Sequence, residues 1–285
     1  MAEILKCTLK EMLNKKILLL ILVLTAIFLA LYGFGLREIY SQQEGVEPLM
    51  AMAATTQLVS IGLYFASFII ALLVIVAAAG TLAGDIESGV MQAMLVKPLK
   101  RWEVVAGKFL GIGLMVAGYS AFLFFAIIGL NLALGARIPF GSANLITGFL
   151  LFLLGPYLLM AATMWGSSRF STLNASIMAV MLYGLAMVGG LLEQVGAMLE
   201  QAGQEGGALV HAGIISSLLL PTDILFRKAT STLFALPGME LFTGLFAVGP
   251  FQGISQPSPW MLAYAGGYAV FFLSLTIKNF GARDI

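Results

Sequence analysis

Long apolar stretches without charge recur along the chain, and six of them are long enough to cross a lipid bilayer as helices. A spanning helix needs about 20 predominantly apolar residues. A charged side chain at the bilayer centre costs roughly 2.5–3.5 kcal/mol on insertion scales, so spans are expected in the gaps between charged residues. The predicted spans, with edges set to within several residues, are 17–36, 58–83, 109–134, 145–165, 175–192 and 260–277.

Two further apolar pieces, 208–220 and 241–254, carry no charge but are too short to span. Each has about 13–14 residues and would be roughly 20 Å long as a helix, against a hydrocarbon core of about 30 Å. Pro221 stops the first piece and Pro250 interrupts the second. We therefore expect re-entrant or surface-lying segments within a large extracytoplasmic region, 193–259, where protein or water satisfies the backbone.

The pattern of apolar and polar residues over 2–16 predicts an amphipathic helix ahead of the first span. A basic helix that leads into a span is typical of a segment lying on the cytoplasmic membrane surface. The alternative is that these residues are only the first turns of the first span. The apolar side chains that share one face of the expected helix are Ile4, Leu5, Leu9, Met12 and Leu13.

The basic residues predict that both termini lie in the cytoplasm. Of the 15 Lys and Arg residues, four precede the first span, four follow the second, one follows the fourth and two follow the sixth. This split of 11 to 4 satisfies the positive-inside rule. A seventh span at 208–220 would leave the split unchanged, so segment length rather than charge favours six spans. We expect a multi-pass protein of the cell membrane.

Composition supports the membrane assignment and excludes several other classes. Hydrophobic residues make up 60% of the chain and charged residues 10%, with a mean hydropathy of +0.99, whereas soluble domains carry about 25% charged residues. The single cysteine, Cys7, excludes an intramolecular disulfide and a multi-cysteine metal site. No basic stripe with interleaved aromatic residues points to nucleic acid.

Motifs for chemistry are absent from the sequence. No G-x-x-x-x-G-K-[ST] phosphate loop occurs, so the chain cannot hydrolyse ATP alone, and no H-E-x-x-H metal motif occurs. The only histidine, His211, lies in an apolar piece and is expected to be structural. No charged residue falls within a predicted span, whereas ion-coupled carriers keep an ionisable group at mid-membrane. We expect no catalytic residue, no cofactor and no metal site in this chain.

The cytoplasmic loop 84–108 has the densest charge in the chain. It begins with a Gly-Asp pair that predicts a break at the end of the second span, followed by a short helix over 88–96. Ser88 is the expected N-cap, Lys97 suits the C-terminal end of the helix dipole, and Pro98 forces a stop. A short capped helix below the bilayer suits docking to a cytoplasmic partner, although a basic loop that only anchors the topology fits the same pattern.

This loop resembles the cytoplasmic loop of permeases of the type-2 ABC exporters, the ABC-2 superfamily. The basic N-terminal helix, the six spans and the large outer region before the last span are also similar. Segments 220–227 and 279–285 resemble the same subunits. Val90 stands where the family usually has Thr. The residues that carry the loop motif are Glu87, Ser88, Gly89, Val90, Leu95, Pro98, Arg101, Gly107 and Lys108.

The resemblance implies a coupling helix that fits a groove on a cytoplasmic ATPase subunit. It also implies pairing with a second permease copy or homologue, with ATP and Mg²⁺ held by the ATPase and no cofactor bound by this chain. The pieces 208–220 and 224–235 would cap the pathway on the outer side. Lipid headgroups or neighbouring helices would be contacted by Arg101, Trp102 and Lys108. The ATPase would be contacted by Asp85, Glu87, Ser88, Gly89, Met91, Met94, Leu95, Lys97 and Pro98.

The leading interpretation is an all-α permease subunit of an ABC exporter. A stand-alone carrier or channel, and a non-transporting scaffold on the same fold, remain open alternatives. An intramembrane enzyme would need a cluster of His, Asp, Glu or Ser–Lys at membrane depth, which the sequence does not offer. The 15 Met and 20 Phe residues favour an amphipathic or lipid-like substrate, although helices that face lipid use the same residues.

Overall fold

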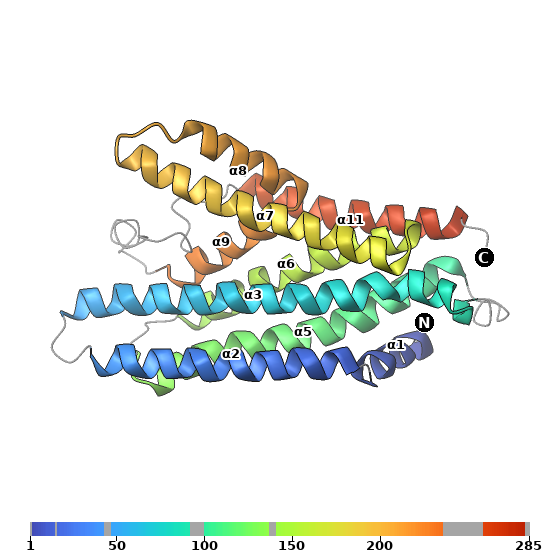
Figure 1. Ribbon diagram of the computed structural model, residues 1–285, viewed down its shortest axis with the longest axis horizontal. Coiled ribbons are helices and arrows are strands. Elements are labelled where there is room, and N and C mark those ends of the chain that lie inside the picture. Colours follow the sequence, from blue (N-terminus) through green and yellow to red (C-terminus); the bar gives the residue numbers. More distant parts are fainter. Residues whose placement is uncertain are drawn as a thin grey trace.

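The computed structural model describes residues 2–14, 16–42, 47–91, 100–136, 141–235 and 259–282. Every regular element in these ranges is a helix, which confirms the predicted all-α class (Figure 1). The predicted apolar piece 241–254 lies outside the described residues. The helices are α1 (Ala2–Asn14), α2 (Lys16–Ser41), α3 (Pro48–Glu87), α5 (Arg101–Ala133), α6 (Ser142–Arg169), α7 (Thr172–Gln201), α8 (Gly207–Leu219), α9 (Thr222–Leu233) and α11 (Pro259–Ala282).

Six described helices are long and apolar enough to cross a membrane: α2, α3, α5, α6, α7 and α11. This number agrees with the sequence prediction, and the two ends of the chain lie at the same end of the bundle, as an even number of crossings requires (Figure 1). The helices extend beyond the predicted spans. For example, α3 begins at Pro48 and α5 at Arg101. A charge-free window locates only the part of a helix inside the hydrocarbon, whereas the helix itself continues into the headgroup region.

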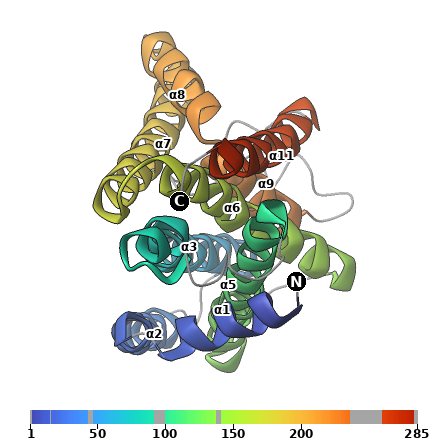
Figure 2. The ribbon, with the colours of Figure 1, turned by 90° about the vertical axis from the view of Figure 1, so that its right-hand side faces the viewer.

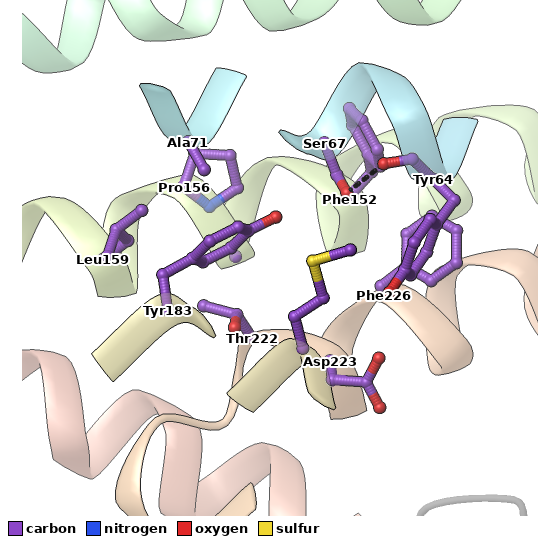
Figure 3. A pocket seen from close by; sticks show the side chains of 12 residues that line it. Tyr64, Ser67, Ala71, Phe152, Pro156, Leu159, Tyr183, Thr222, Asp223 and Phe226 are labelled. Carbon is purple, nitrogen blue, oxygen red and sulfur yellow. Dashed lines mark hydrogen bonds between the residues drawn. The ribbon is translucent and has the colours of Figure 1, made fainter. Parts of the chain in front are cut away.

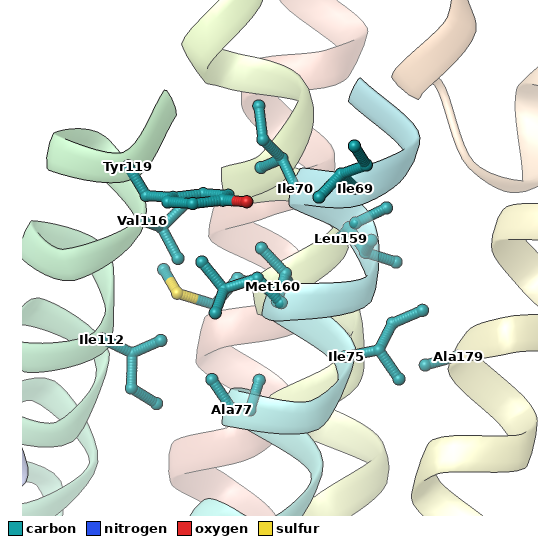
Figure 4. Close-up of a cluster of buried hydrophobic side chains, with 14 of the residues drawn as sticks. Ile69, Ile70, Ile75, Ala77, Ile112, Val116, Tyr119, Leu159, Met160 and Ala179 are labelled. Atoms are coloured by element: carbon teal, nitrogen blue, oxygen red, sulfur yellow. The ribbon is translucent and has the colours of Figure 1, made fainter. Parts of the chain in front are cut away.

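Helix α3 lies inside the bundle and packs against α5, α6 and α7. Its inner faces are aliphatic and small. Ile70 and Val74 are almost fully buried, and they belong to the same hydrophobic cluster as Ile112 of α5 and Met160 of α6. Figure 4 shows part of this cluster. By contrast, α2 exposes a long apolar surface on which Phe34 is 73% accessible, as expected of a helix that faces lipid or another protein.

Helix α1 is a separate helix that lies across one end of the bundle (Figure 2). It packs against α5, and its buried face consists of Ile4, Thr8 and Met12, which are spaced four residues apart. Thr8 and the Leu5 carbonyl approach Gly111 so closely that a Cβ there would lie 3.0 to 3.2 Å from them. A glycine on α5 therefore allows α1 to dock. The predicted position of α1 at the membrane surface stays a prediction.

Polar side chains join α2 to α5 within the bundle. Asn131 of α5 donates to the Tyr32 hydroxyl at 2.9 Å and accepts from the Tyr40 hydroxyl at 2.8 Å. Farther along the same helices, the hydroxyls of Thr25 and Tyr119 are hydrogen-bonded to each other. These bonds stabilise a helix pair in an environment where polar groups have few other partners.

Helices α8 and α9 meet at an angle of 104° around Pro221. The Thr222 carbonyl lies beside Gly155, in the middle of α6. From there α9 runs along α6 towards its beginning, where Asn144 donates to the Ala235 carbonyl at 2.6 Å. The first residues of α8 lie beside the end of α7, at Gly196. The start of α8 and the end of α9 therefore both lie at the end of the bundle where α6 begins. The corner between α8 and α9 lies half-way along α6.

Glycines allow α8 to lie directly on α7. A Cβ on Gly196 of α7 would come within 2.8 Å of the Val210 amide nitrogen and 2.9 Å of the Gly206 carbonyl oxygen. At the corner, Tyr264 and Tyr268 of α11 donate to the carbonyls of Leu218 and Leu219 at 2.6 and 2.8 Å. They satisfy carbonyl groups that the end of a helix leaves without partners.

Candidate functional site

The end of α3 leads into the loop that the sequence singled out. The predicted break at Gly84 is wrong, since α3 continues without interruption to Glu87. Ser88 is the residue that follows the end of this helix, and its hydroxyl donates back to the Gly84 carbonyl at 2.7 Å. Gly89 follows with a φ of 73°, the left-handed conformation that commonly terminates helices and that glycine adopts without strain.

Part of the predicted coupling helix lies outside the described residues, namely 92–99 with Met94, Leu95, Lys97 and Pro98. A helix over 88–96 therefore stays a prediction. Among the described candidates, the structure exposes Glu87, Ser88 and Gly89 and buries Asp85 and Met91. The exposed candidates are thus confined to a short stretch that begins at the last residue of α3.

Asp85 forms a buried ion pair with Lys108 of α5. The Lys108 ammonium also donates to the Thr81 carbonyl at 2.5 Å, so it bridges two points on the last turns of α3. The side chain of Lys108 is 3% exposed and that of Asp85 is 12% exposed. Lys108, predicted to contact headgroups or a neighbouring helix, lies against a helix, and Asp85 points into the protein rather than towards a partner.

Ser167 of α6 makes a second connection to the end of α3. Its hydroxyl donates to the Ala79 carbonyl at 2.6 Å and lies 3.0 Å from the Ala83 amide nitrogen. The side chain is completely buried. No sequence pattern singles out this serine, because a lone hydroxyl near the end of a span is usual in membrane helices.

Glu87 makes the third connection. Its carboxylate accepts a hydrogen bond from the Thr172 backbone amide at 3.0 Å and another from the Thr172 hydroxyl at 2.9 Å. Thr172 is the first residue of α7, where amide groups lack partners in the helix and the helix dipole favours negative charge. The last residue of α3 therefore caps α7.

The beginning of α5 is attached to the end of α11. The Arg101 guanidinium donates to the carbonyls of Phe280 at 3.3 Å and Gly281 at 2.9 Å, and cations are favourable beside such C-terminal carbonyl groups. Arg101 therefore contacts a neighbouring helix, one of the two possibilities that the sequence analysis raised. Trp102 follows with 46% of its surface exposed.

A second polar centre lies where α7, α8 and α9 meet. Arg227 of α9 forms two parallel hydrogen bonds with Glu193 of α7, at 2.7 and 2.8 Å. Its Nε lies 2.9 Å from the Asp223 carboxylate, one turn earlier on α9. All three side chains are more than nine-tenths buried. These residues lie in the region 193–259 that was predicted to be extracytoplasmic. The spacing of Asp223 and Arg227, four residues apart on one helix, could have identified the pair.

A cavity of about 40 Å³ lies next to this centre (Figure 3). Four helices contribute to its walls: α3, α6, α7 and α9. Tyr64, Gly155 and Tyr183 fall near the middles of α3, α6 and α7, so the cavity is about half-way through the bundle. Its lining residues are Tyr64, Ser67, Ala71, Phe152, Gly155, Pro156, Leu159, Tyr183, Met187, Thr222, Asp223 and Phe226.

Comparison with known proteins agrees with this architecture. No curated protein matches the chain. A profile of one protein family, described as ABC-2 family transporter protein, matches residues 3–285. The match includes the six spanning helices, the loop after α3 and the α8–α9 pair. The chain therefore belongs to the ABC-2 family of membrane transporters.

Proposed function

We propose that this permease is driven by a separate cytoplasmic ATPase, which binds the segment that follows Glu87. The observation that supports this is the set of connections at the end of α3. Asp85 pairs with Lys108 on α5, Ser167 of α6 bonds to the α3 backbone, and Glu87 caps α7. A displacement of the loop would therefore move four helices together.

In this proposal the ATPase holds ATP and Mg²⁺ and this chain supplies the translocation pathway. The contact surface begins with the exposed residues Ser88, Gly89 and Val90 and continues into 92–97. Asp85 and Met91 are excluded from the contact because they are buried. Asp85 holds the end of α3 in place from inside the bundle through its ion pair with Lys108.

A binding measurement tests this assignment. The chain is co-expressed with an ABC ATPase that co-purifies with it, and binding is measured after solubilisation. Val90 is 45% exposed, so V90D adds a charge to the proposed contact without disturbing the core. We expect at least a tenfold loss of ATPase binding. The matched control is Gln204→Asp, which introduces the same charged side chain in the exposed turn between α7 and α8. Normal ATPase binding by V90D would refute the assignment.

We further propose that both termini and the loop after α3 face the cytoplasm of the cell. The support is the distribution of basic residues together with the position of both chain ends at one end of the bundle (Figure 1). Cys7 is exposed on α1. In spheroplasts, a membrane-impermeant thiol reagent should leave Cys7 unmodified until the membrane is opened. In a C7S background, Gln204→Cys should react at once. The opposite labelling pattern would invert the topology.

Two copies of the chain, or one copy and a homologue, are proposed to form the complete permease. The support is the amount of apolar surface that α2, α7 and α11 leave exposed, including Phe34, Met181 and Phe271. The mass of the complex in lipid nanodiscs tests this proposal. A particle that contains a single permease chain together with the ATPase would contradict it.

A stand-alone carrier is the second candidate, and one observation favours it. The absence of charged residues from the predicted spans counts against a carrier, but the structure buries Glu193, Asp223 and Arg227 among the helices. Transport by vesicles that contain the chain and no ATPase would decide for the carrier. Transport that requires the ATPase and hydrolysable ATP would decide for the exporter.

A further inference from the structure

The cavity half-way through the bundle combines aromatic walls with one acidic side chain. The aromatic lining residues Tyr64, Phe152, Tyr183 and Phe226 come from four different helices, and among the described residues Asp223 is the one acidic lining residue. Figure 3 shows Tyr64 and Tyr183 approaching the space from opposite sides, with Asp223 at its edge. The Tyr64 and Phe226 rings pack edge to face with centroids 5.4 Å apart, which holds this part of the wall in a fixed geometry.

The charges next to the cavity do not balance. Both Glu193 and Asp223 pair with the same guanidinium, that of Arg227. With all three groups ionised, the cluster carries one negative charge more than it has positive charge. A buried charge without a partner is costly, and charged groups inside a membrane protein pair with one another or mark a ligand pathway. The cluster is therefore complementary to one additional positive charge.

The walls and the size of the cavity specify the kind of cation. The faces of aromatic rings attract ammonium groups. Among the described residues, no three His, Cys, Asp or Glu side chains gather as they would around a metal ion. A volume of about 40 Å³ is several times the roughly 10–15 Å³ that one water needs. It is far below the roughly 300–1,000 Å³ of a pocket for a whole drug-sized ligand. The space therefore suits a small charged headgroup.

We propose that this cavity binds the primary ammonium group of an amphipathic substrate, with Asp223 as the counter-ion and the rings of Tyr64 and Tyr183 as walls. Glu193 does not contact the ligand in this arrangement. It holds Arg227 with two hydrogen bonds and so leaves Asp223 with only one ion-pair contact to the guanidinium. This inference rests on the proposed transport role, because it names the class of substrate that the permease would carry.

The test uses the purified chain in lipid nanodiscs without any ATPase, and n-hexylammonium as the probe. Binding is measured by isothermal titration at pH 7, with the signal from empty nanodiscs subtracted to remove partitioning into lipid. Hexanol, which has the same tail but no charge, and sodium chloride are the comparison ligands. We expect saturable binding of hexylammonium, at least tenfold weaker binding of hexanol, and no competition from equimolar sodium ions.

Asp223→Asn is the decisive variant because it keeps the shape of the side chain and removes only its charge. We expect at least a tenfold loss of hexylammonium affinity. Glu200→Gln, a matched change at an exposed position on α7, should keep the wild-type affinity. Equal affinity in Asp223→Asn would overturn the proposal, because the charge of this carboxyl group would then make no contribution to binding.

The wild-type selectivity series decides the matter even if Asp223→Asn does not fold. Hexanol binding as tight as hexylammonium binding would overturn the proposal, since the cavity would then be only a hydrophobic pocket. Displacement by sodium ions would also overturn it, in favour of an alkali-ion site. Loss of ATPase binding in the earlier experiment does not affect this series, so failure of the coupling proposal and failure of the ammonium site can be told apart.

Discussion

Glu87 and Thr172, 85 positions apart in the sequence, connect the last residue of α3 to the first residue of α7 through two hydrogen bonds to one carboxylate. Glu87 was expected to contact a partner, and the structure shows that it also caps a helix of its own chain. A partner that displaced this carboxylate by moving the adjoining loop would release the start of α7. The contact is therefore suited to a change between two arrangements.

Glu87→Gln and Thr172→Ala should change coupling more than stability. Both changes weaken an exposed capping contact, which is typically worth about 1 kcal/mol. We expect ATP hydrolysis by the complex to become less dependent on transported substrate, with the thermal unfolding temperature nearly unchanged. The measurement is the ratio of substrate-stimulated to basal ATPase activity in nanodiscs. If both variants keep the wild-type ratio, the contact is only structural.

Removing one member of the Asp85–Lys108 pair should be strongly destabilising. Lys108→Met leaves a buried carboxylate without a partner, and breaking a buried ion pair in this way costs about 3–5 kcal/mol. The double variant Asp85→Leu/Lys108→Met should recover much of this loss because no buried charge remains. Unfolding in detergent monitored by circular dichroism checks both expectations. Lys100→Met, at an exposed position before α5, is the control.

Arg227→Met should be more damaging still, because it leaves both Glu193 and Asp223 buried without a cation. Arg227→Lys should rescue only part of the stability, since a lysine cannot reproduce the two parallel hydrogen bonds to Glu193. The readout is the fraction of protein that remains monodisperse after heating in detergent. Lys228→Met, on the less buried side of the same helix, provides the comparison and should behave like the wild-type protein.

Two glycines on α7 should respond in opposite ways to the same substitution. Gly196→Ala would place a Cβ within 3.0 Å of backbone atoms of Val210 and Gly206, so α8 has to move away. Gly184 has no neighbouring atom within 4 Å of such a Cβ, and alanine favours a helix over glycine by up to about 1 kcal/mol. We expect Gly196→Ala to lower the unfolding temperature and Gly184→Ala to keep or raise it. Equal shifts would contradict the close packing of α8 on α7.

The sequence predicted the helical class and the number of spanning helices. It could do so because the thickness of the bilayer and the free-energy cost of placing a charge inside it apply to all parts of the chain alike. It did not predict the ends of the helices. At Gly84 the Gly-Asp pair indicated a break, but Asp85 is held inside by Lys108 and the helix continues. The partner that decides this lies on another helix, 23 positions away in the sequence, and no local pattern contains it.

The buried ion cluster was missed for a related reason. Glu193, Asp223 and Arg227 lie in stretches that the spacing of charges assigns to the outside, because each charge is costly by itself. Together the three side chains form ion pairs that offset most of the cost of burying each charge alone, which is how charged residues are tolerated inside a bundle. Only the corner at Pro221, which returns α9 along α6, brings the three side chains together.

Helix α3 contains 40 residues, which at 1.5 Å per residue makes a rod about 60 Å long. It is attached to three other helices at the end where the loop begins, and it lines the central cavity with Tyr64 and Ser67 near its midpoint. A rod of this length acts as a lever arm. A tilt of about 5° at the loop moves the far end by roughly 5 Å and the cavity wall by roughly half as much. A rotation of a few degrees at the loop end of α3 would therefore change the shape of the cavity and the position of the far end of the helix at the same time.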